Sequence, residues 1–398
     1  MSIKPTDWQE LEKKVFMPVF KRNPLTLVRG KGMKVWDDTG KEYLDFVGGL
    51  AVTSLGHCHP VLVNAVTKQA ATLIQTSNLY YTVPQLQLAE LLVKTSCLDR
   101  VFIGNSGAEA VEGAMKLARR YGKIKRDGAY EIITTHESFH GRTLATTAAT
   151  GQNKFQEPYT PLPTGFVNVP YNDIEAIKRA TTKLTCAVML EPIQGEGGVN
   201  VPDDDYLAKV RSWCDEKGLL LILDEIQTGI GRTGSLYAYQ QYGVEPDIMT
   251  IAKGLGGGVP IGAFLAKEAA CVFKPGEHGS TFGGNPLVCA AGYAVLSYII
   301  DNHIPEHVQK AGSYLYNGLQ DLAGKYAAIT GVRGKGLLLA VGLKDEIAGE
   351  LVLACMEKGL LVNNVKPDAL RLIPPLVVTE KDIRKALDIL DKVFKERQ

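Results

Sequence analysis

Short apolar runs alternate with segments of helical periodicity through the middle of this chain of 398 residues. The alternation constrains the fold more than any other feature, because it is typical of a parallel sheet whose strands are joined by crossover helices. The predicted strands are residues 101–103, 132–134, 186–190, 219–223 and 248–251, and amphipathic helices are predicted over residues 108–121 and 206–217. We therefore expect an α/β fold in which a mostly parallel sheet is flanked by helices.

The pattern changes near Tyr293, after which helices are predicted over residues 295–302 and 308–325. A strand flanked by glycines follows within residues 331–343, and a charged helix over residues 380–397 comes last. This change of pattern predicts three regions. They are an N-terminal segment (1–46) that joins the small domain, a large domain (47–295) and a smaller α+β domain at the C-terminus (296–398).

Charge and composition exclude several classes of protein. Lysine and arginine number 44 and aspartate and glutamate 43, so a net charge of +1 provides no field that recruits nucleic acid or an anionic membrane. The start of the chain resembles neither a secretory signal nor a transit peptide, and no apolar run approaches the ~18 residues of a membrane span. Seven widely spaced cysteines predict reduced thiols in a cytoplasmic protein.

Two apparent motifs do not predict a binding site. His57, Cys58 and His59 are adjacent, so they cannot easily converge on one ion, and a turn before Pro60 explains them better than a metal site. Residues 229–234 match GxGxxG, but they do not directly follow their strand, and no convincing second unit with a ribose-binding acid comes after them. A nicotinamide dehydrogenase is therefore disfavoured, and the absence of a GxxxxGKS or GxxxxGKT motif disfavours a nucleotide triphosphatase.

Two charged residues follow predicted buried strands. Asp224 comes directly after five aliphatic residues, and Lys253 follows the next strand, 253 − 224 = 29 residues later. Ligands of open α/β sheets bind at the carboxyl ends of the strands. A carboxylate there needs a cationic partner, although structural ion pairing explains Asp224 equally well, and a desolvated lysine becomes a usable amine because its pKa falls. Glycines at 254, 256, 257 and 258 clear space beside Lys253, which argues against a surface lysine.

Residues 101–109 run from a predicted strand through small residues into a predicted helix. Ser106 and Glu109 have the spacing of a capping box. The N–H groups of Gly107 and Ala108, at the positive end of the helix, are suited to a phosphate group. An ordinary capped helix has the same pattern, so this motif alone leaves both interpretations open.

Residues 278–286 place two hydroxyls, Ser280 and Thr281, between glycines, where they can donate to an oxyanion or form a plain turn. Phosphate donors, a strand-end carboxylate and a strand-end lysine together match the needs of pyridoxal 5'-phosphate. The lysine forms a Schiff base, the acid keeps the pyridine nitrogen protonated, and the donors hold the phosphate. We therefore predict pyridoxal 5'-phosphate as the cofactor.

Over nearly its whole length, the chain resembles the class III (ornithine-type) aminotransferases of the fold-type I pyridoxal-phosphate enzymes, and among them the bacterial acetylornithine type. The segments that carry the resemblance are GKGMKVWDDTGKEYLDF (30–46), LGHCHP (55–60), GNSGAEAVEGAMKLAR (104–119), ESFHGRTLA (137–145), EPIQGEGG (191–198), LDEIQTGIGRTG (223–234), AKGLGGGVPIGA (252–263), HGSTFGGNP (278–286) and LRLIPPL (370–376). The resemblance implies transamination of N2-acetyl-L-ornithine with 2-oxoglutarate, a step of arginine biosynthesis. It also implies an obligate homodimer with active sites at the subunit interface.

The same resemblance assigns roles to individual residues. Lys253 would form the Schiff base and Asp224 would pair with the pyridine nitrogen, while Phe139 would stack on the ring. Gln227 would lie near the phenolic oxygen, and Thr281 would reach the phosphate of the neighbouring subunit. The full set of implied cofactor contacts is Ser106, Gly107, Ala108, Phe139, Asp224, Glu225, Ile226, Gln227, Lys253 and Thr281.

The implied substrate contacts are Arg142, Ser280, Glu196 and Arg371. Arg142 would clamp the α-carboxylate, a task that suits the bidentate guanidinium group. Arg371 would bind a carboxylate of 2-oxoglutarate and would pair with Glu196 when the other substrate is present. The family often has Phe-Ala-Pro after this arginine, whereas this chain has Leu-Ile-Pro, an apolar change that barely disturbs the assignment. Taken singly, Phe139 is also explained as a core residue and Arg142 as a surface charge. Glu196 and Arg371 are also explained as a structural ion pair.

Several alternatives stay open at this point. The amino donor can instead be ornithine, succinylornithine, 4-aminobutyrate or an intermediate of lysine synthesis, although residues 78–81 favour the acetylornithine type by similarity. An aminomutase of the same fold would need no 2-oxoglutarate. A non-catalytic relative is disfavoured because Lys253, Asp224 and Arg142 are all present.

Overall fold

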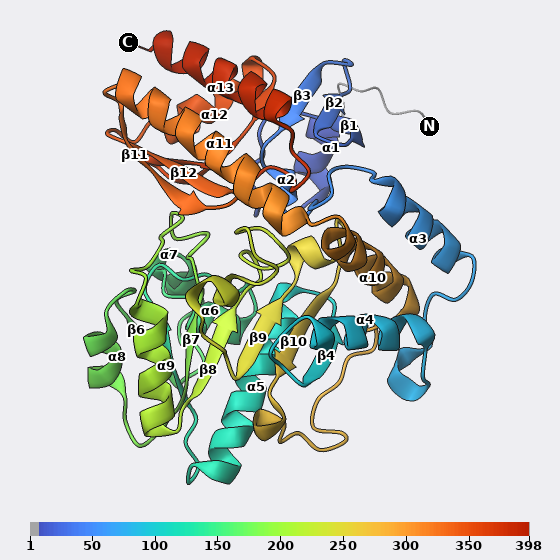
Figure 1. The fold of residues 1–398 in the computed structure, drawn as a ribbon, viewed down its shortest axis with the longest axis vertical. Coiled ribbons are helices and arrows are strands. Elements are labelled where there is room, and N and C mark those ends of the chain that lie inside the picture. The colour runs from blue at the N-terminus through green and yellow to red at the C-terminus, as the bar shows by residue number, and fades with distance from the viewer. Residues whose placement is uncertain (1–7, 398) are drawn as a thin grey trace.

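The computed structural model describes residues 8–397 and contains three β-sheets (Figure 1). The largest has seven strands in the order β4-β10-β9-β8-β7-β5-β6. Their bounds are β4 (Arg100–Gly104), β5 (Glu131–Thr135), β6 (Phe166–Val169), β7 (Thr185–Leu190), β8 (Leu220–Asp224), β9 (Ile248–Ile251) and β10 (Gly262–Ala266). Strands β9, β8, β7, β5 and β6 run parallel, and β10 is antiparallel to both of its neighbours. The predicted α/β fold with a mostly parallel sheet is therefore confirmed.

The central strands of this sheet are buried on both faces, which explains their nearly continuous apolar sequences. Each of the five predicted strands is present, and the structure adds β6 and β10. Strand β6 was not predicted because it lies at the edge of the sheet, is only half-buried and contains a polar Asn168. Strand β10 is short and lies in a glycine-rich stretch that reads as a loop.

Helices connect and cover these strands. They are α3 (Pro60–Ala70), α4 (Val83–Lys94), α5 (Gly107–Lys125), α6 (Leu144–Ala149), α7 (Asn153–Gln156), α8 (Ile174–Ala180) and α9 (Tyr206–Lys217). Helix α9 has the predicted bounds and ends at Gly218, whose φ of 62° supplies the left-handed conformation of a helix C-terminus. Helix α5 extends beyond the predicted residue 121 and packs across β7, β9 and β10.

The C-terminal third forms α10 (Pro286–Asp301), α11 (Ile304–Lys325), β11 (Ile329–Lys335), β12 (Leu338–Leu343), α12 (Ala348–Glu357), β13 (Leu360–Leu361), β14 (Asn363–Lys366), β15 (Ala369–Leu372) and α13 (Glu380–Lys395). An antiparallel sheet here has the order β11-β12-β15-β14. A single strand is predicted within 331–343, but the structure has a hairpin of β11 and β12 there. The hairpin turns at Gly336, which has a φ of 56°. The predicted boundary at 295/296 falls inside α10, which packs on α3 and α4.

The N-terminal elements are α1 (Trp8–Val15), β1 (Leu27–Lys31), β2 (Lys34–Asp37), β3 (Glu42–Asp45) and α2 (Gly48–Ala51). Strand β3 pairs in parallel with β13, with Leu44 opposite Leu360, so the two ends of the chain share a sheet. Figure 1 shows the blue N-terminal strands beside the orange and red C-terminal elements, above the seven-stranded sheet. Short 3-10 helices complete the structure: η2 (Ser77–Leu79), η3 (Glu157–Tyr159), η4 (Ala238–Tyr242), η5 (Lys253–Leu255) and η6 (Glu268–Ala270).

Helix hydropathy gives no clear membrane span. Among residues 8–397, no single helix is both long and apolar enough to cross a membrane. Helices α10 and α11 meet that criterion only when they are taken together, and they bend by 69° where they join.

The packing of α5 on β10 generates a stability prediction. A Cβ atom added at Gly113 would lie 2.2 Å from Cε1 of Phe264, whose ring is buried. We expect Gly113→Ala to lower the free energy of unfolding by about 1–3 kcal/mol, because overpacking outweighs the gain in helix propensity. Urea denaturation followed by circular dichroism measures this change.

Gly324 in α11 provides the matched control, because a Cβ there meets no atom within 4 Å. Gly324→Ala should raise the stability by up to about 1 kcal/mol through helix propensity alone. Equal stability changes in the two variants would contradict the packing explanation.

Candidate active site

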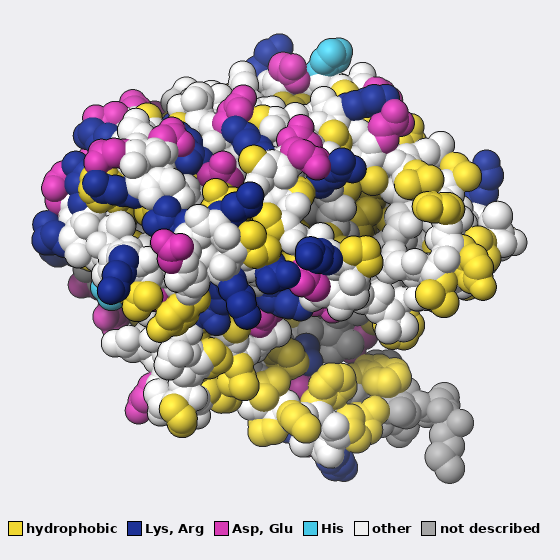
Figure 2. Space-filling view, turned by 90° about the horizontal axis from the view of Figure 1, so that it is seen from below, with side chains coloured by type: hydrophobic (Ala, Val, Ile, Leu, Met, Phe, Trp, Pro, Cys, Tyr) yellow, Lys and Arg dark blue, Asp and Glu magenta, His cyan; other side chains and the backbone are white. Residues whose placement is uncertain are grey.

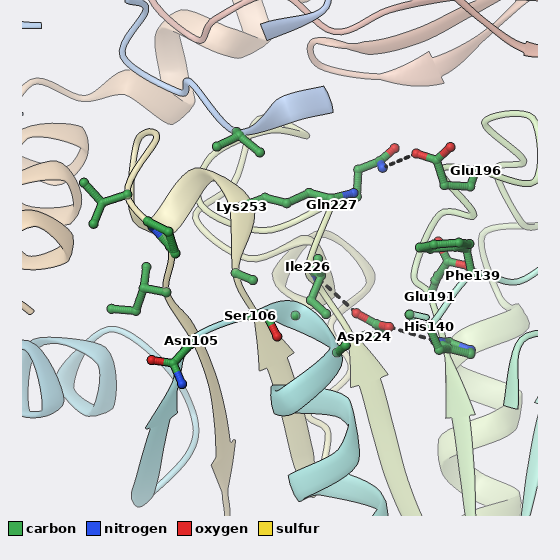
Figure 3. A pocket seen from close by; sticks show the side chains of 18 of the residues that line it. Asn105, Ser106, Phe139, His140, Glu191, Glu196, Asp224, Ile226, Gln227 and Lys253 are labelled. Carbon is green, nitrogen blue, oxygen red and sulfur yellow. Dashed lines mark hydrogen bonds and ion pairs between the residues drawn. The ribbon is translucent and has the colours of Figure 1, made fainter. Parts of the chain in front are cut away.

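A cavity of about 390 Å³ lies at the carboxyl ends of β8 and β9, beneath the small C-terminal sheet (Figure 3). Its size is in the range of ligand pockets, roughly 300–1,000 Å³. The predicted site residues that line it are Ser106, Gly107, Ala108, Phe139, Glu196, Asp224, Ile226, Gln227 and Lys253. The structure thus brings together residues that are up to 147 positions apart in the chain (253 − 106).

Asp224 ends strand β8 at the floor of the cavity and is almost fully buried. One carboxylate oxygen accepts hydrogen bonds from the hydroxyl of Thr250 at 3.0 Å and the N–H of Ile226 at 3.1 Å. The other oxygen lies 2.7 Å from Nδ1 of His140, which is also buried (Figure 3). The partner that the sequence required for this carboxylate is therefore an imidazole. Sequence reasoning missed it, although His140 stands inside the FHGR segment.

Lys253 follows β9 and projects across the cavity toward Gln227 (Figure 3). Its backbone has a φ of 42°, a left-handed conformation that is uncommon and costly for a residue with a side chain. Burial lowers the pKa of the Lys253 amine below its usual value, while the nearby Glu196 carboxylate partly opposes this shift. The strand end thus holds an amine that loses its proton more readily than a surface lysine does.

The N-terminus of α5 forms one wall of the cavity. Ser106 caps the helix by accepting a hydrogen bond from the N–H of Glu109 at 3.2 Å. Only this half of the predicted capping box is present, since the Glu109 carboxylate accepts instead from the N–H of Asn105. The first N–H groups of a helix have no acceptor within the helix, so those of Gly107 and Ala108 are available to an anion. A Cβ on Gly107 would lie 2.8 Å from Cδ1 of Ile226, so glycine is needed for this close packing.

Arg371, from strand β15 of the C-terminal sheet, approaches the site with its side chain fully buried. Its Nη1 donates to Oε1 of Glu196 at 2.6 Å and to Oε1 of Gln227 at 3.0 Å. Gln227 in turn donates to Glu196 at 3.0 Å. Burial disfavours the Glu196 carboxylate, but Arg371 and Lys253 outweigh it and lower its pKa to about 2. Nη2 of Arg371 is buried without a hydrogen-bond partner among the described residues.

Glu191 is a second buried carboxylate of the cavity, and it was not predicted. It follows β7 and accepts hydrogen bonds from the N–H of Phe139 at 2.9 Å and the N–H of Gly195 at 3.0 Å. Burial raises the pKa of this carboxyl to about 7, and the Asp224 carboxylate adds to the effect while His140 opposes it. Its position as the first residue of EPIQGEGG, directly after an apolar strand, was the signal that could have identified it.

Five predicted residues are not among those that line the cavity within this chain: Arg142, Ser280, Thr281, Glu225 and Arg371. Arg142 is exposed beside Phe139, and Thr281 is exposed on the loop that follows η6. The hydroxyl of Ser280 accepts a hydrogen bond from the side-chain amide of Asn105 at 3.1 Å. It accepts a second one from the N–H of Gly283 at 2.9 Å.

The side chain of Glu225, a predicted cofactor contact, does not line the cavity. Its carboxylate is buried on the side away from the cavity and accepts from the N–H groups of Ala238 at 2.8 Å and Tyr239 at 2.7 Å. Its own N–H donates to the carbonyl of Thr250. The reason is geometric, because consecutive residues leaving a strand point to opposite sides, so Glu225 faces away where Asp224 faces in.

The cavity offers the groups that pyridoxal 5'-phosphate requires. Free helix N–H groups can hold a phosphate, the buried Asp224 carboxylate can hold a protonated ring nitrogen, and Lys253 supplies an amine. Phe139 lines the cavity beside His140, where its ring can cover a planar ligand. The residues therefore fit this cofactor.

Comparisons with known proteins agree with this chemistry. The family model of the class-III aminotransferases matches residues 16–394. The acetylornithine aminotransferase of Caldanaerobacter subterraneus subsp. tengcongensis is 54% identical over 386 residues, which covers 97% of this chain and 98% of that protein. The solved ornithine aminotransferase of Toxoplasma gondii matches with a TM-score of 0.95 and 34% identity, covering 100% of this chain and 97% of the other. The acetylornithine aminotransferase of Elizabethkingia anophelis matches with a TM-score of 0.89 and 36% identity, covering 99% and 100%.

The buried pair of Arg371 and Glu196 generates a prediction about stability and pH. Glu196→Gln leaves the guanidinium with neutral partners only, so we expect a loss of about 2 kcal/mol of unfolding free energy at pH 7. The folded-state pKa of Glu196 is lowered from 4.5 to about 2, so its stabilising effect is present above pH 4.5 and is lost as the pH falls towards 2. Urea unfolding at a series of pH values measures both effects.

Glu137→Gln is the matched control, since Glu137 pairs with Lys366 at 2.9 Å on the surface, with side chains 48% and 35% exposed. This variant should lose less than about 1 kcal/mol. A difference between wild type and Glu196→Gln that does not shrink in acid would contradict the pairing.

Proposed function

The chain belongs to the class-III aminotransferases, and on that premise we propose that it transfers the amino group of N2-acetyl-L-ornithine to 2-oxoglutarate. The products are N-acetylglutamate 5-semialdehyde and glutamate, a step of arginine biosynthesis. The observation that carries this proposal is the 2.6 Å pair between Arg371 and Glu196 at the cavity. Arg371 serves a dicarboxylate acceptor when it is free, and Glu196 neutralises it when a donor without a second carboxylate is bound.

The cofactor is pyridoxal 5'-phosphate, as in the family. When bound, it supplies an aldehyde that takes up an amino group and a ring that delocalises the electron pair left when a proton leaves the adjacent carbon. Ser106, Gly107 and Ala108 would hold its phosphate at the positive end of α5. The Asp224 carboxylate would keep the ring nitrogen protonated. The contact with Nδ1 of His140 at 2.7 Å fixes the position of this carboxylate.

Lys253 would move the proton in each half of the reaction. Its Nζ reaches across the cavity, and its lowered pKa leaves a larger fraction of the amine unprotonated near neutral pH than in an ordinary lysine, so that it is available as a base. After it has taken the proton from the carbon that bears the amino group, the resulting ammonium is stabilised by the neighbouring Glu196 carboxylate. The Lys253 ammonium would then give this proton to the former aldehyde carbon of the cofactor and not back to the carbon from which it came.

Arg142 would bind the α-carboxylate of the donor at the rim of the cavity. A guanidinium offers two parallel N–H donors to a carboxylate, which fixes the orientation of the ligand as well as its charge. The 5-amino group of acetylornithine would then extend towards Lys253. The acetyl amide is neutral and needs no second cation, so Arg371 can stay paired with Glu196 while this donor is bound.

The active unit would be a homodimer of cytoplasmic subunits with each site completed by the partner. Figure 2 shows apolar side chains gathered over the right and lower right of the molecule. Exposed apolar residues occur in two segments, 16–20 and 79–86, and next to Thr281: Phe16, Met17, Val19, Phe20, Leu79, Tyr80, Tyr81, Val83, Leu86 and Phe282. Exposed apolar surface of this kind marks protein interfaces, and an interface there would let Thr281 reach the phosphate in the neighbouring subunit.

Mixed dimers test the shared site. Thr281→Ala should weaken cofactor binding about tenfold, because a hydrogen bond to a charged phosphate is lost. When Thr281→Ala and Lys253→Ala subunits are exchanged, one site of each mixed dimer carries both wild-type residues, so activity should return. Sedimentation should also give the mass of a dimer. The exchange is assayed at a cofactor concentration that leaves Thr281→Ala dimers mostly empty; if the mixture is then no more active than its components, the sites are not shared.

A donor panel tests the reaction. With 2-oxoglutarate as acceptor, kcat/KM should be highest for N2-acetylornithine and lower for ornithine, N2-succinylornithine and 4-aminobutyrate. A higher value for another donor would replace acetylornithine as the substrate while keeping the transaminase mechanism. Turnover without any acceptor would point instead to an aminomutase.

Lys253→Ala provides the negative control for the panel. It should lack the visible absorbance of the lysine-bound cofactor and nearly all turnover, because no other lysine among the described residues lines the cavity. A normal rate in this variant would refute the assignment of Lys253.

A further inference from the structure

The guanidinium of Arg142 is held by aromatic rings. No hydrogen bond or ion pair of its side chain is present among residues 8–397, although it is charged and exposed. Its central carbon lies 4.1 Å from the centroid of the Phe155 ring and 5.4 Å from that of Phe139. The shorter distance identifies Phe155 as the main contact.

Stacking on a ring leaves the donors of a guanidinium free. The attraction to the ring uses the face of the planar group, whereas its five N–H bonds point outward in the plane. An arginine held in this way can still bind a carboxylate with two parallel hydrogen bonds. It also loses less side-chain freedom on binding than an unrestrained surface arginine does.

Phe155 is itself fixed by the surrounding structure. It lies in α7, where Gln152 at the start donates to the carbonyl of Ser138 at 2.9 Å, in the turn that leads to Phe139. Gln156 at the end donates to the carbonyl of Thr150 at 2.7 Å. The Phe155 ring meets the Phe139 ring edge-on, with centroids 5.8 Å apart and planes at 79°. The half-buried ring of Phe155 is thus tied to the same loop that places Phe139 in the cavity.

We propose that Phe155 is a positioning residue for carboxylate recognition, which holds the plane of Arg142 so that its N–H edge faces the substrate. This inference rests on the proposed function, in which Arg142 binds the α-carboxylate of the donor. Phe155 itself contacts Arg142 and Phe139 and does not line the cavity.

The test compares two donors that differ only in the α-carboxylate: N2-acetylornithine and N-acetyl-1,4-diaminobutane. Phe155→Leu should lower kcat/KM for acetylornithine roughly threefold to tenfold, mainly through KM, and should leave the value for the carboxylate-free amine unchanged. Phe155→Tyr, which keeps an aromatic face, should restore the wild-type ratio. The Kd of glutarate, measured by calorimetry, should rise by the same factor in Phe155→Leu and provides a readout independent of turnover.

Phe166→Leu is the matched control. Arg119 lies 4.9 Å from the centroid of Phe166, so this variant removes another arginine–phenylalanine contact outside the cavity. It should not change the ratio between the two donors. If Phe155→Leu does not fold, Phe155→Met keeps more of the side-chain volume without an aromatic face and replaces it.

Arg142→Met separates this inference from the proposed function. Arg142→Met should abolish the preference for the carboxylated donor, and Phe155→Leu should have no further effect on the preference in that background. If Arg142→Met keeps the preference, the proposed role of Arg142 fails and this inference fails with it. Suppose instead that Arg142→Met loses the preference for the carboxylated donor. If Phe155→Leu then keeps that preference, or lowers kcat/KM equally for both donors, only the positioning role of Phe155 is refuted.

Discussion

The burial of the Asp224 carboxylate at the end of β8 is the constraint on which the site depends. A charged group removed from water must be fully hydrogen-bonded. Otherwise the group itself becomes neutral, or its charge destabilises the fold. Its partners come from three different segments: His140 follows β5, Thr250 belongs to β9, and Ile226 lies in the turn after β8. Satisfying one carboxylate therefore fixes the relative positions of the loops that line the cavity. The wall formed by Phe139 is adjacent to His140 and is placed by the same contact.

The same buried environment gives neighbouring groups opposite ionisation behaviour. Burial disfavours the charged form of both Glu191 and Glu196, but only Glu196 is hydrogen-bonded to a guanidinium. The pKa of Glu196 consequently falls to about 2, whereas that of Glu191, which accepts only backbone N–H groups, rises to about 7. Lys253 lies among these groups with its pKa lowered by burial. One cavity thus contains a permanent carboxylate, a carboxyl that titrates near neutrality and an amine suited to proton transfer.

The C-terminal sheet contributes to the site through Arg371 on β15, and several contacts hold this sheet in place. The buried guanidinium of Arg232, in the turns that follow β8, donates to the carbonyls of Leu337 and Pro374, and Arg333 on β11 donates to the carbonyl of Gly198 at 2.7 Å. Residues 229–234, which match GxGxxG, begin no α-helix among the described residues and instead carry this arginine. The glycines there permit tight turns against the C-terminal elements, so the motif has a structural explanation.

The sequence by itself determined the parallel sheet, the strand-end positions of Asp224 and Lys253, and the chemical set that indicates pyridoxal phosphate. These properties are local, because strand periodicity and the residue that ends a strand can be read from neighbouring positions. The roles of Arg142, Glu196 and Arg371 came from the family resemblance. Only the tertiary structure decided that His140 pairs with Asp224, that Glu225 faces away from the cavity and that Phe155 holds Arg142. Those outcomes depend on the direction in which side chains leave the turns and on contacts between segments far apart in the chain. Neither can be predicted from the pattern of neighbouring residues.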